Sequence, residues 1–114
     1  SHQLYRSKEV AHVIDAWLDQ NIPLDAVFAT SDVAAANVLA ALAARNIKVP
    51  KQIQVVGYDD VPLSMQIYPQ LTTVRQPLDL AAEALVDLLM EKIAGEPSRA
   101  VILAASLIKR KSTL

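Results

Sequence analysis

The chain has 114 residues, of which 53% are hydrophobic and 20% charged, enough apolar side chain for one packed domain and too much for a disordered segment. Eleven basic residues face twelve acidic ones, a formal net charge of -1, which argues against a dedicated nucleic-acid-binding domain. The sequence contains no cysteine, which excludes disulfides, thiol catalysis, iron–sulfur clusters and most structural zinc sites.

The first half of the chain alternates between helical and strand patterns. Apolar residues recur at helical spacing from a start near Ser7, and Asn21 and Pro23 end this first helix. A short apolar run at 26–29 has the length of a strand. The stretch 33–45 is rich in Ala and Leu and contains neither Gly nor Pro, so a second helix is predicted there.

The second half continues the alternation. Further strands are predicted at 53–57, 71–75 and 101–108, and a helical turn at 64–68. A long helix is predicted at 77–94, because Pro77 occupies the favoured first position and Gly95 stands where helices end. One face of this helix is rich in leucine.

This order predicts an α/β fold with a mainly parallel sheet flanked by helices. The strand patterns are almost continuously apolar, which is typical of sheets covered on both faces. Ligands of such sheets bind beyond the carboxyl ends of the strands. Three polar loops, 30–32, 58–60 and 75–76, follow predicted strands, and we expect them at one edge of the sheet.

Four segments in order resemble the effector domain of the LacI/GalR family of bacterial transcription regulators. They are Phe-Ala-Thr-Ser-Asp at 28–32, Ile-Gln-Val-Val-Gly-Tyr-Asp-Asp at 53–60, Leu-Thr-Thr-Val-Arg-Gln-Pro at 71–77 and Leu-Ile-Lys-Arg-Lys-Ser-Thr-Leu at 107–114. The resemblance implies a periplasmic-binding-protein-like domain of type I, in which two lobes enclose a sugar or similar small metabolite.

The resemblance further implies that residues 1–114 form a single partial domain, roughly the C-terminal half of the effector domain, with no DNA-binding domain present. The chain would cross between the lobes near Gln76. The helix 77–94 would then belong to the missing N-terminal lobe, with its apolar face exposed. We expect this helix either to dimerise or to fold back onto the sheet.

Three residues are candidates for ligand binding. Asp59 matches the family's ligand-binding aspartate, and its carboxylate could accept hydrogen bonds from two sugar hydroxyls; the alternative is a turn residue. Ser31 stands where many relatives carry a ligand-binding asparagine, and its alternative is a helix cap. Gln76 matches a ligand-binding position at the lobe crossing, and its alternative is a capping residue before Pro77.

Neighbouring polar residues are interpreted more simply. We expect Asp60 to shape the turn, Asp32 to cap the next helix and Arg75 to be solvated. The basic residues 109–111 are interpreted as a solvated tail.

Aromatic residues receive two kinds of interpretation. Trp17, Phe28 and Tyr58 are predicted as core residues, so that any aromatic side chain stacking on a sugar would come from the missing lobe. Tyr68 resembles a family position at a dimer interface, and its alternative is an exposed loop tyrosine.

Catalysis finds no support, since the chain lacks a nucleophile elbow, a Walker A loop, a Gly-x-Gly-x-x-Gly motif and a Cys–His pair. No catalytic residue, metal site or cofactor is therefore predicted, and we expect a protein that is not an enzyme. Asp59 and Asp60 are adjacent, unlike the spaced carboxylates of a glycosidase.

The leading hypothesis is an effector-binding fragment of a LacI/GalR-like regulator, cytoplasmic and homodimeric, which contacts DNA only through a missing N-terminal helix-turn-helix domain and does not associate with membranes. A sugar-binding receptor of a transport system would share the fold and is the main alternative. A small enzyme of doubly wound fold is a third possibility.

Overall fold

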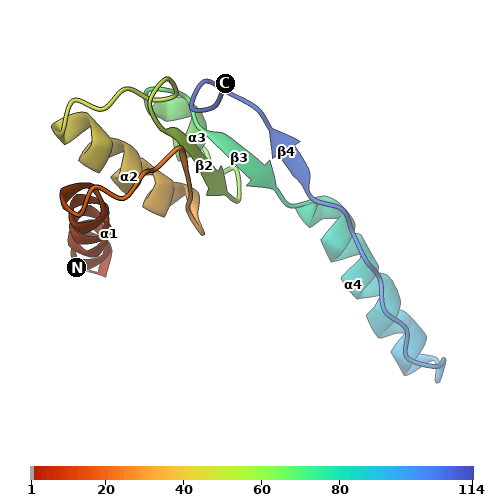
Figure 1. Ribbon diagram of the computed structural model, residues 1–114. Coiled ribbons are helices and arrows are strands. Elements are labelled where there is room, and N and C mark those ends of the chain that lie inside the picture. Colours follow the sequence, from red (N-terminus) through yellow and green to blue (C-terminus); the bar gives the residue numbers. More distant parts are fainter. Residues whose placement is uncertain (1) are drawn as a thin grey trace. The chain divides into compact units, whose positions relative to one another are not determined.

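The computed structural model describes residues 2–114, with side chains from Lys8 onward. Helices and strands alternate along the chain (Figure 1). The elements are α1 (His2–Asp19), β1 (Ala26–Phe28), α2 (Asp32–Ala44), β2 (Gln54–Tyr58), α3 (Leu63–Gln66), β3 (Thr72–Arg75), α4 (Leu78–Ile93) and β4 (Ser106–Ile108).

The strands form one four-stranded sheet in the order β1-β2-β3-β4. β1 and β2 are parallel, with Phe28 opposite Val56, and β2 and β3 are parallel, with Tyr58 opposite Val74. The predicted α/β class with a mainly parallel sheet is thereby confirmed.

The chain divides into two compact units. The first comprises the residues up to Arg75 together with Leu107–Leu114, and the second comprises Gln76–Ser106. The chain therefore passes from one unit to the other twice, after Arg75 and after Ser106.

In the first unit, the core lies where α2 packs on the sheet and α1 packs on α2. Ala35 and Leu42 of α2 are fully buried, as are Val55 of β2 and Leu71 before β3. Ile14 is the fully buried contribution of α1. Small alanine side chains let α2 lie close to the sheet, which explains why so Ala-rich a sequence forms the central helix.

Along β2 the side chains alternate in burial. Val55 and Gly57 are buried, whereas Val56 and Tyr58 are half-buried. Phe28, the last residue of β1, is 61% exposed. Among the described residues, therefore, only one face of the sheet is fully packed. The other face, which carries Phe28, Val56 and Tyr58, is only partly covered by the described residues.

The core assignments of three aromatic residues change accordingly. Phe28 and Tyr58 are not fully buried because they belong to the less covered face of the sheet. Trp17 lies on α1 beside β1 and is 38% exposed, because no further element of the described chain covers that edge.

Two element boundaries also differ from the sequence-based expectation. The first helix begins at His2 rather than near Ser7, because the residues between them include neither Gly nor Pro to stop it. The last strand is short, covering only Ser106–Ile108, and residues 99–105 have no regular structure despite their apolar sequence.

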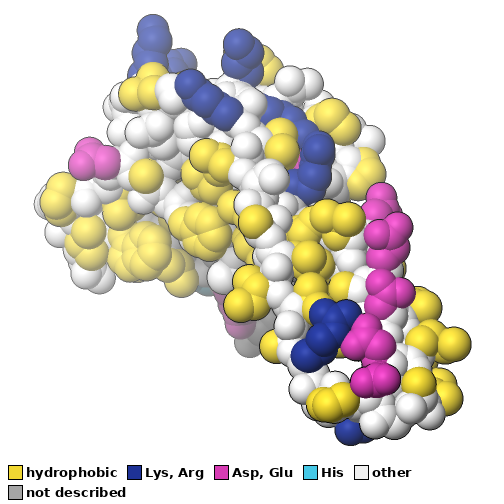
Figure 2. Space-filling view, turned by 90° about the vertical axis from the view of Figure 1, so that its right-hand side faces the viewer, with side chains coloured by type: hydrophobic (Ala, Val, Ile, Leu, Met, Phe, Trp, Pro, Cys, Tyr) yellow, Lys and Arg dark blue, Asp and Glu magenta, His cyan; other side chains and the backbone are white. Residues whose placement is uncertain are grey.

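The second unit consists of α4 and the segment that returns from it. No residue of α4 is buried. Its exposed large apolar side chains are Leu78, Leu80, Leu85, Val86, Leu89, Met90 and Ile93. Figure 2 shows a row of acidic side chains along this helix with apolar side chains beside it. Within residues 2–114, no helix combines the length and apolar character needed to cross a membrane.

Candidate ligand-binding edge of the sheet

Two of the sequence-predicted residues follow neighbouring parallel strands. Ser31 lies three residues beyond the end of β1, and Asp59 directly follows β2. Since β1 and β2 are parallel and in register, both residues lie at the carboxyl edge of the sheet. Gln76 directly follows β3 and is the first residue of the second unit.

Ser31 is the N-cap of α2. Its backbone is extended, and its Oγ accepts a 3.1 Å hydrogen bond from the backbone N–H of Ala34. The capping interpretation therefore holds, and it leaves room for a second role, because a hydroxyl that accepts one hydrogen bond can still donate its own proton. Together with Thr30, Ser31 lines a hollow of about 580 Å³ between α2 and α1, where Glu9 and Asn37 also contribute.

Asp59 lies exposed on a strained loop. Its φ is 104° and that of Asp60 is 54°, both in the region that favours glycine. Two such residues cost roughly 1–3 kcal/mol each, so other contacts must hold the loop. One is the 2.8 Å hydrogen bond from the Asp59 N–H to the carbonyl of Val74, and another is the 2.8 Å bond from the Val61 N–H to Asp32 Oδ2.

Asp32 is not the helix cap that the sequence predicted. It is the first residue of α2, it is 1% exposed, and its carboxylate turns toward the sheet. Oδ1 accepts a 2.6 Å hydrogen bond from the hydroxyl of Thr73, while Oδ2 accepts from Val61. The prediction failed because Ser31 already caps the helix, which leaves Asp32 to join α2, β3 and the loop after β2.

Asp60 does more than shape a turn. Its side chain is 6% exposed and is surrounded by donors. Arg110 Nη2 donates to Oδ1 at 2.7 Å, Arg75 donates from Nε and Nη2 to Oδ2 at 2.7 Å, and Ser64 Oγ lies 3.0 Å from Oδ1. Burial raises the pKa of Asp60, but the hydrogen bonds from Arg110, Arg75 and Ser64 bring it below its ordinary value.

Arg110 contacts Asp60 beside the candidate site, a role that the sequence did not predict. The solvated-tail interpretation of 109–111 is wrong for its central residue, whose side chain is 11% exposed. Besides Asp60, its guanidinium donates to Ser64 Oγ and to the carbonyl of Leu71, each at 2.9 Å. No sequence signal distinguished Arg110 from its neighbours Lys109 and Lys111. In the structure, Ile108, Arg110 and Ser112 are each more buried than the residues beside them, as alternate residues of an extended segment can be.

Arg75 is partly as expected. Its side chain is 56% exposed, as the solvated interpretation requires, yet it forms the ion pair with Asp60. The C-terminal segment is fastened next to it, because the Arg110 N–H donates to Thr72 Oγ1 and the Thr72 N–H donates to Ser112 Oγ, both at 2.8 Å. Ser112 in turn donates to the carbonyl of Val55 at 2.6 Å.

An aromatic pair adjoins the loops at the carboxyl edge. Phe28 and Tyr58, the last residues of β1 and β2, meet edge to face with ring centroids 6.5 Å apart and an interplanar angle of 71°. The exposed Phe28 ring offers an apolar surface at the end of β1, the strand that precedes Ser31, so the described residues include an exposed aromatic side chain at this edge of the sheet.

Tyr68 lies on the loop after α3 and is 96% exposed. It borders a hollow of about 330 Å³ whose other lining residues include Leu39, Ile47 and Pro69. So exposed an aromatic ring beside a partly apolar hollow is typical of a surface that meets a partner, and its role at a dimer interface stays a prediction.

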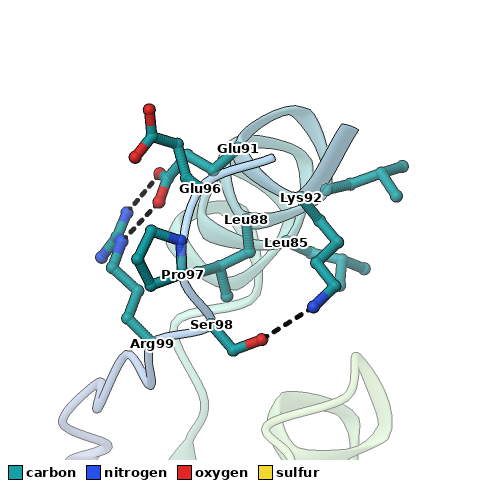
Figure 3. Close-up of a pocket in the computed structure, with 9 residues that line it drawn as sticks. Leu85, Leu88, Glu91, Lys92, Glu96, Pro97, Ser98 and Arg99 are labelled. Carbon is teal, nitrogen blue, oxygen red and sulfur yellow. Dashed lines mark hydrogen bonds and ion pairs between the residues drawn. The ribbon is translucent and has the colours of Figure 1, made fainter. Parts of the chain in front are cut away.

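The second unit holds a separate hollow of about 280 Å³ between α4 and the segment after it (Figure 3). Both nitrogens of the bidentate Arg99–Glu91 ion pair lie 2.7 Å from their oxygens, and Lys92 Nζ donates to Ser98 Oγ at 3.0 Å. The ion pair balances the charges of Arg99 and Glu91, and the hydrogen bond from Arg99 lowers the pKa of Glu91. No residue predicted to bind ligand lines it.

Within the described residues, no three or more His, Cys, Asp or Glu side chains come together in a way that could hold a metal ion. The carboxyl edge of the sheet offers the exposed carboxylate of Asp59 and the hydroxyls of Thr30 and Ser31 for hydrogen bonding. The exposed ring of Phe28 adds an apolar surface. Such a set can recognise a polyhydroxy compound.

Known proteins share this fold and parts of this sequence. A family model described as a periplasmic binding protein-like domain matches residues 2–113. The regulator GalS of Salmonella typhimurium is 41% identical over 68% of the chain, and the regulator CelR of Thermobifida fusca is 37% identical over 83%. The chain covers 23% and 28% of these two relatives, about a quarter of their length.

Solved structures extend the similarity over nearly the whole chain. A LacI-type transcription regulator from Bifidobacterium animalis matches with a TM-score of 0.81 and 34% identity, over 95% of this chain and 39% of that one. A lac repressor dimer bound to operator and an anti-inducer matches with 0.82 and 30%, over 96% and 37%. A CelR–cellobiose complex matches with 0.80 and 34%, over 93% and 33%.

Proposed function

Because the chain belongs to the periplasmic binding protein-like domain family, among its LacI-type transcription regulators, we propose that it forms part of a domain that binds a sugar-like effector. The observation that carries this proposal is the carboxyl edge of the sheet. There an exposed carboxylate, Asp59, is presented on a strained loop whose geometry two other aspartates maintain. Strain that is maintained in this way is typical of a binding site.

Asp59 supplies the strongest interaction in this proposal. A carboxylate accepts hydrogen bonds from adjacent hydroxyls, and bonds to a charged acceptor are roughly twice as strong as neutral ones. Ser31 contributes its hydroxyl from the start of α2, and Phe28 offers a ring face. Gln76, which directly follows β3, is the third ligand-binding residue of this proposal.

The remainder of the domain lies outside these 114 residues in this proposal, since the chain covers about a quarter of the GalS and CelR relatives. The helix 77–94 belongs to the other lobe, which covers its apolar face. Two observations support this assignment. No residue of α4 is buried, and α4 belongs to a compact unit separate from the one that contains Asp59.

The mechanism is one of differential affinity. An effector that binds one arrangement of the two lobes better than another shifts the population toward it, and the shift alters operator binding by a separate N-terminal helix-turn-helix domain. The whole protein is a cytoplasmic homodimer, with Tyr68 at the interface, and not an enzyme. The lac repressor, solved as a dimer on its operator, supports this scheme.

The test is thermal unfolding of the chain with D-ribose, D-galactose and cellobiose, which represent a pentose, a hexose and a disaccharide. A sugar present at ten times its dissociation constant should raise the free energy of unfolding by about 1.4 kcal/mol. Half a cleft binds weakly, so the titration is repeated on the full-length regulator. The Asp59→Asn variant, which tolerates the left-handed backbone, should weaken binding about 10- to 100-fold.

The matched control is Asp25→Asn, an exposed aspartate at the opposite end of β1, which should bind as the unmodified chain does. Equal sugar affinity for Asp59→Asn and Asp25→Asn would contradict the assignment of Asp59. The chain alone should not bind operator DNA. Tight, specific binding would contradict the proposal that a separate N-terminal domain contacts the operator.

A further inference from the structure

Both connections between the two units are flanked by an arginine that binds the side chain of Asp60. The first crossing follows Arg75, and the second leads into Leu107–Leu114. Arg75 holds Asp60 Oδ2 through Nε and Nη2, and Arg110, in the segment after the second crossing, holds Oδ1 through Nη2, all at 2.7 Å. The Asp60 carboxylate thus binds Arg75, the last residue before the first crossing, and Arg110, which lies shortly after the second crossing.

The carboxylate is firmly held and stands next to the proposed ligand-binding residue. Asp60 is 6% exposed and Arg110 11%, so water does little to screen their ion pair. Asp59 and Asp60 are consecutive, and both have positive φ. Because a single planar peptide unit joins their Cα atoms, a displacement of Asp59 is passed directly to Asp60.

We propose that Asp60 is a positioning residue that clamps both crossings to the loop carrying Asp59, so that the loop and the two segments leading to the second unit move together. The ligand-dependent part of this inference rests on the proposed function. Ligand bound at Asp59 would then displace both connections to the second unit at once, rather than one of them.

The competing explanation is that Asp60 only stabilises the first unit. A substitution of Arg75 distinguishes this explanation from the clamp. The Arg75 side chain is 56% exposed, so its ion pair adds little to global stability. If the pair merely adds stability, its loss has little effect anywhere. If the pair clamps the first crossing, its loss loosens that crossing alone.

The experiment is amide hydrogen exchange of the chain without sugar, comparing the unmodified protein with Arg75→Gln and Asp60→Asn. We expect exchange at 72–78 to become at least fivefold faster in Arg75→Gln, with α2 unchanged. In Asp60→Asn, both 72–78 and 106–112 should accelerate. Should Asp60→Asn fail to fold, Arg75→Gln still decides the question.

The matched control is Arg99→Gln, which removes a 52% exposed arginine that also holds one carboxylate with two nitrogens. It should leave 72–78 unchanged. Unchanged exchange at 72–78 in Arg75→Gln, or an equal acceleration throughout the first unit, would overturn the clamp.

A second arm adds whichever sugar of the panel binds. Exchange at both crossings should change on binding to the unmodified protein and should not change in Asp60→Asn. An identical response in the two proteins would overturn the clamp. If no sugar binds the full-length regulator, the proposed function fails, while the exchange measured without sugar still decides whether Asp60 holds the crossings.

Discussion

Thr73 Oγ1 donates a 2.6 Å hydrogen bond to Asp32 Oδ1, which joins β3 to the first residue of α2 across 41 positions of sequence. Both side chains are buried, at 0% and 1% exposure. The second oxygen of Asp32 accepts from the Val61 N–H, so the same carboxylate fixes the loop that presents Asp59. A buried charge is tolerated here because donors satisfy it.

Replacing Asp32 with alanine should therefore destabilise the first unit. The hydroxyl of Thr73 and the N–H of Val61 would lose a charged acceptor, and we expect a loss of about 2–4 kcal/mol in the free energy of unfolding. Urea denaturation followed by circular dichroism measures it. Asp25→Ala, at an exposed position, is the control, and an equal effect of the two substitutions would contradict the assigned role.

Gly57 should not tolerate a side chain. A Cβ added there would meet Asp32 Oδ1 and would lie 2.7 Å from Leu71 Cδ2. Gly57→Ala should cost about 1–3 kcal/mol through overpacking, measured by thermal unfolding.

The contrast with the chain's other glycine sharpens the test. Gly95 has a φ of +83° and nothing within 4 Å of an added Cβ. Gly95→Ala should therefore cost only about 1 kcal/mol, from the backbone conformation alone. A larger loss at Gly95 than at Gly57 would refute the steric explanation.

Acid should weaken the fold through Asp60. Its pKa lies below the ordinary value because the bonds from Arg110, Arg75 and Ser64 outweigh the effect of burial. The unfolded chain therefore binds a proton more readily, and the stability present at neutral pH is lost as the pH falls from about 4 through the folded pKa.

Asp60→Asn should lower the free energy of unfolding at pH 7 by about 3–5 kcal/mol, because it leaves the buried Arg110 without its countercharge. The difference from the unmodified chain should begin to shrink below about pH 4, and it should be lost once the pH falls below the lowered folded pKa of Asp60. Urea unfolding across this range measures both curves, and a gap that stays constant down to the lowest pH would count against the pairing.

The exposed face of α4 should make the isolated chain associate. Leu85 and Leu89 lie on the same face and are 68% and 58% exposed. Light scattering over a concentration series should show a dimer, and Leu85→Glu combined with Leu89→Glu should give a monomer with unchanged helix content. Tyr68→Glu tests the other surface, and a monomer from Tyr68→Glu alone would transfer the association to that surface.

Much of the fold was predictable because its signals are local. The Ala- and Leu-rich stretch ending before Asn46 predicted α2, and the position of Pro77 predicted the start of α4. The order of elements predicted a parallel sheet, and hence which loops share an edge. Burial was less predictable. The sequence predicts Phe28 as a core residue, but no element of the described residues covers its ring, which is 61% exposed.

The sequence by itself determined the order of helices and strands, the family and the position of Asp59 at the end of a strand, since periodicity, breakers and motifs act within a few residues. Only the tertiary structure decided what Asp32, Asp60 and Arg110 do. The contacts of Asp32 with Val61 and Thr73, and of Asp60 with Arg110, join residues 29 to 50 positions apart. Which oxygen meets which donor depends on the packing of α2, β3 and the C-terminal segment together. A carboxylate in a polar loop has the same local sequence whether it faces water or a buried guanidinium, and only its position in the fold decides between them.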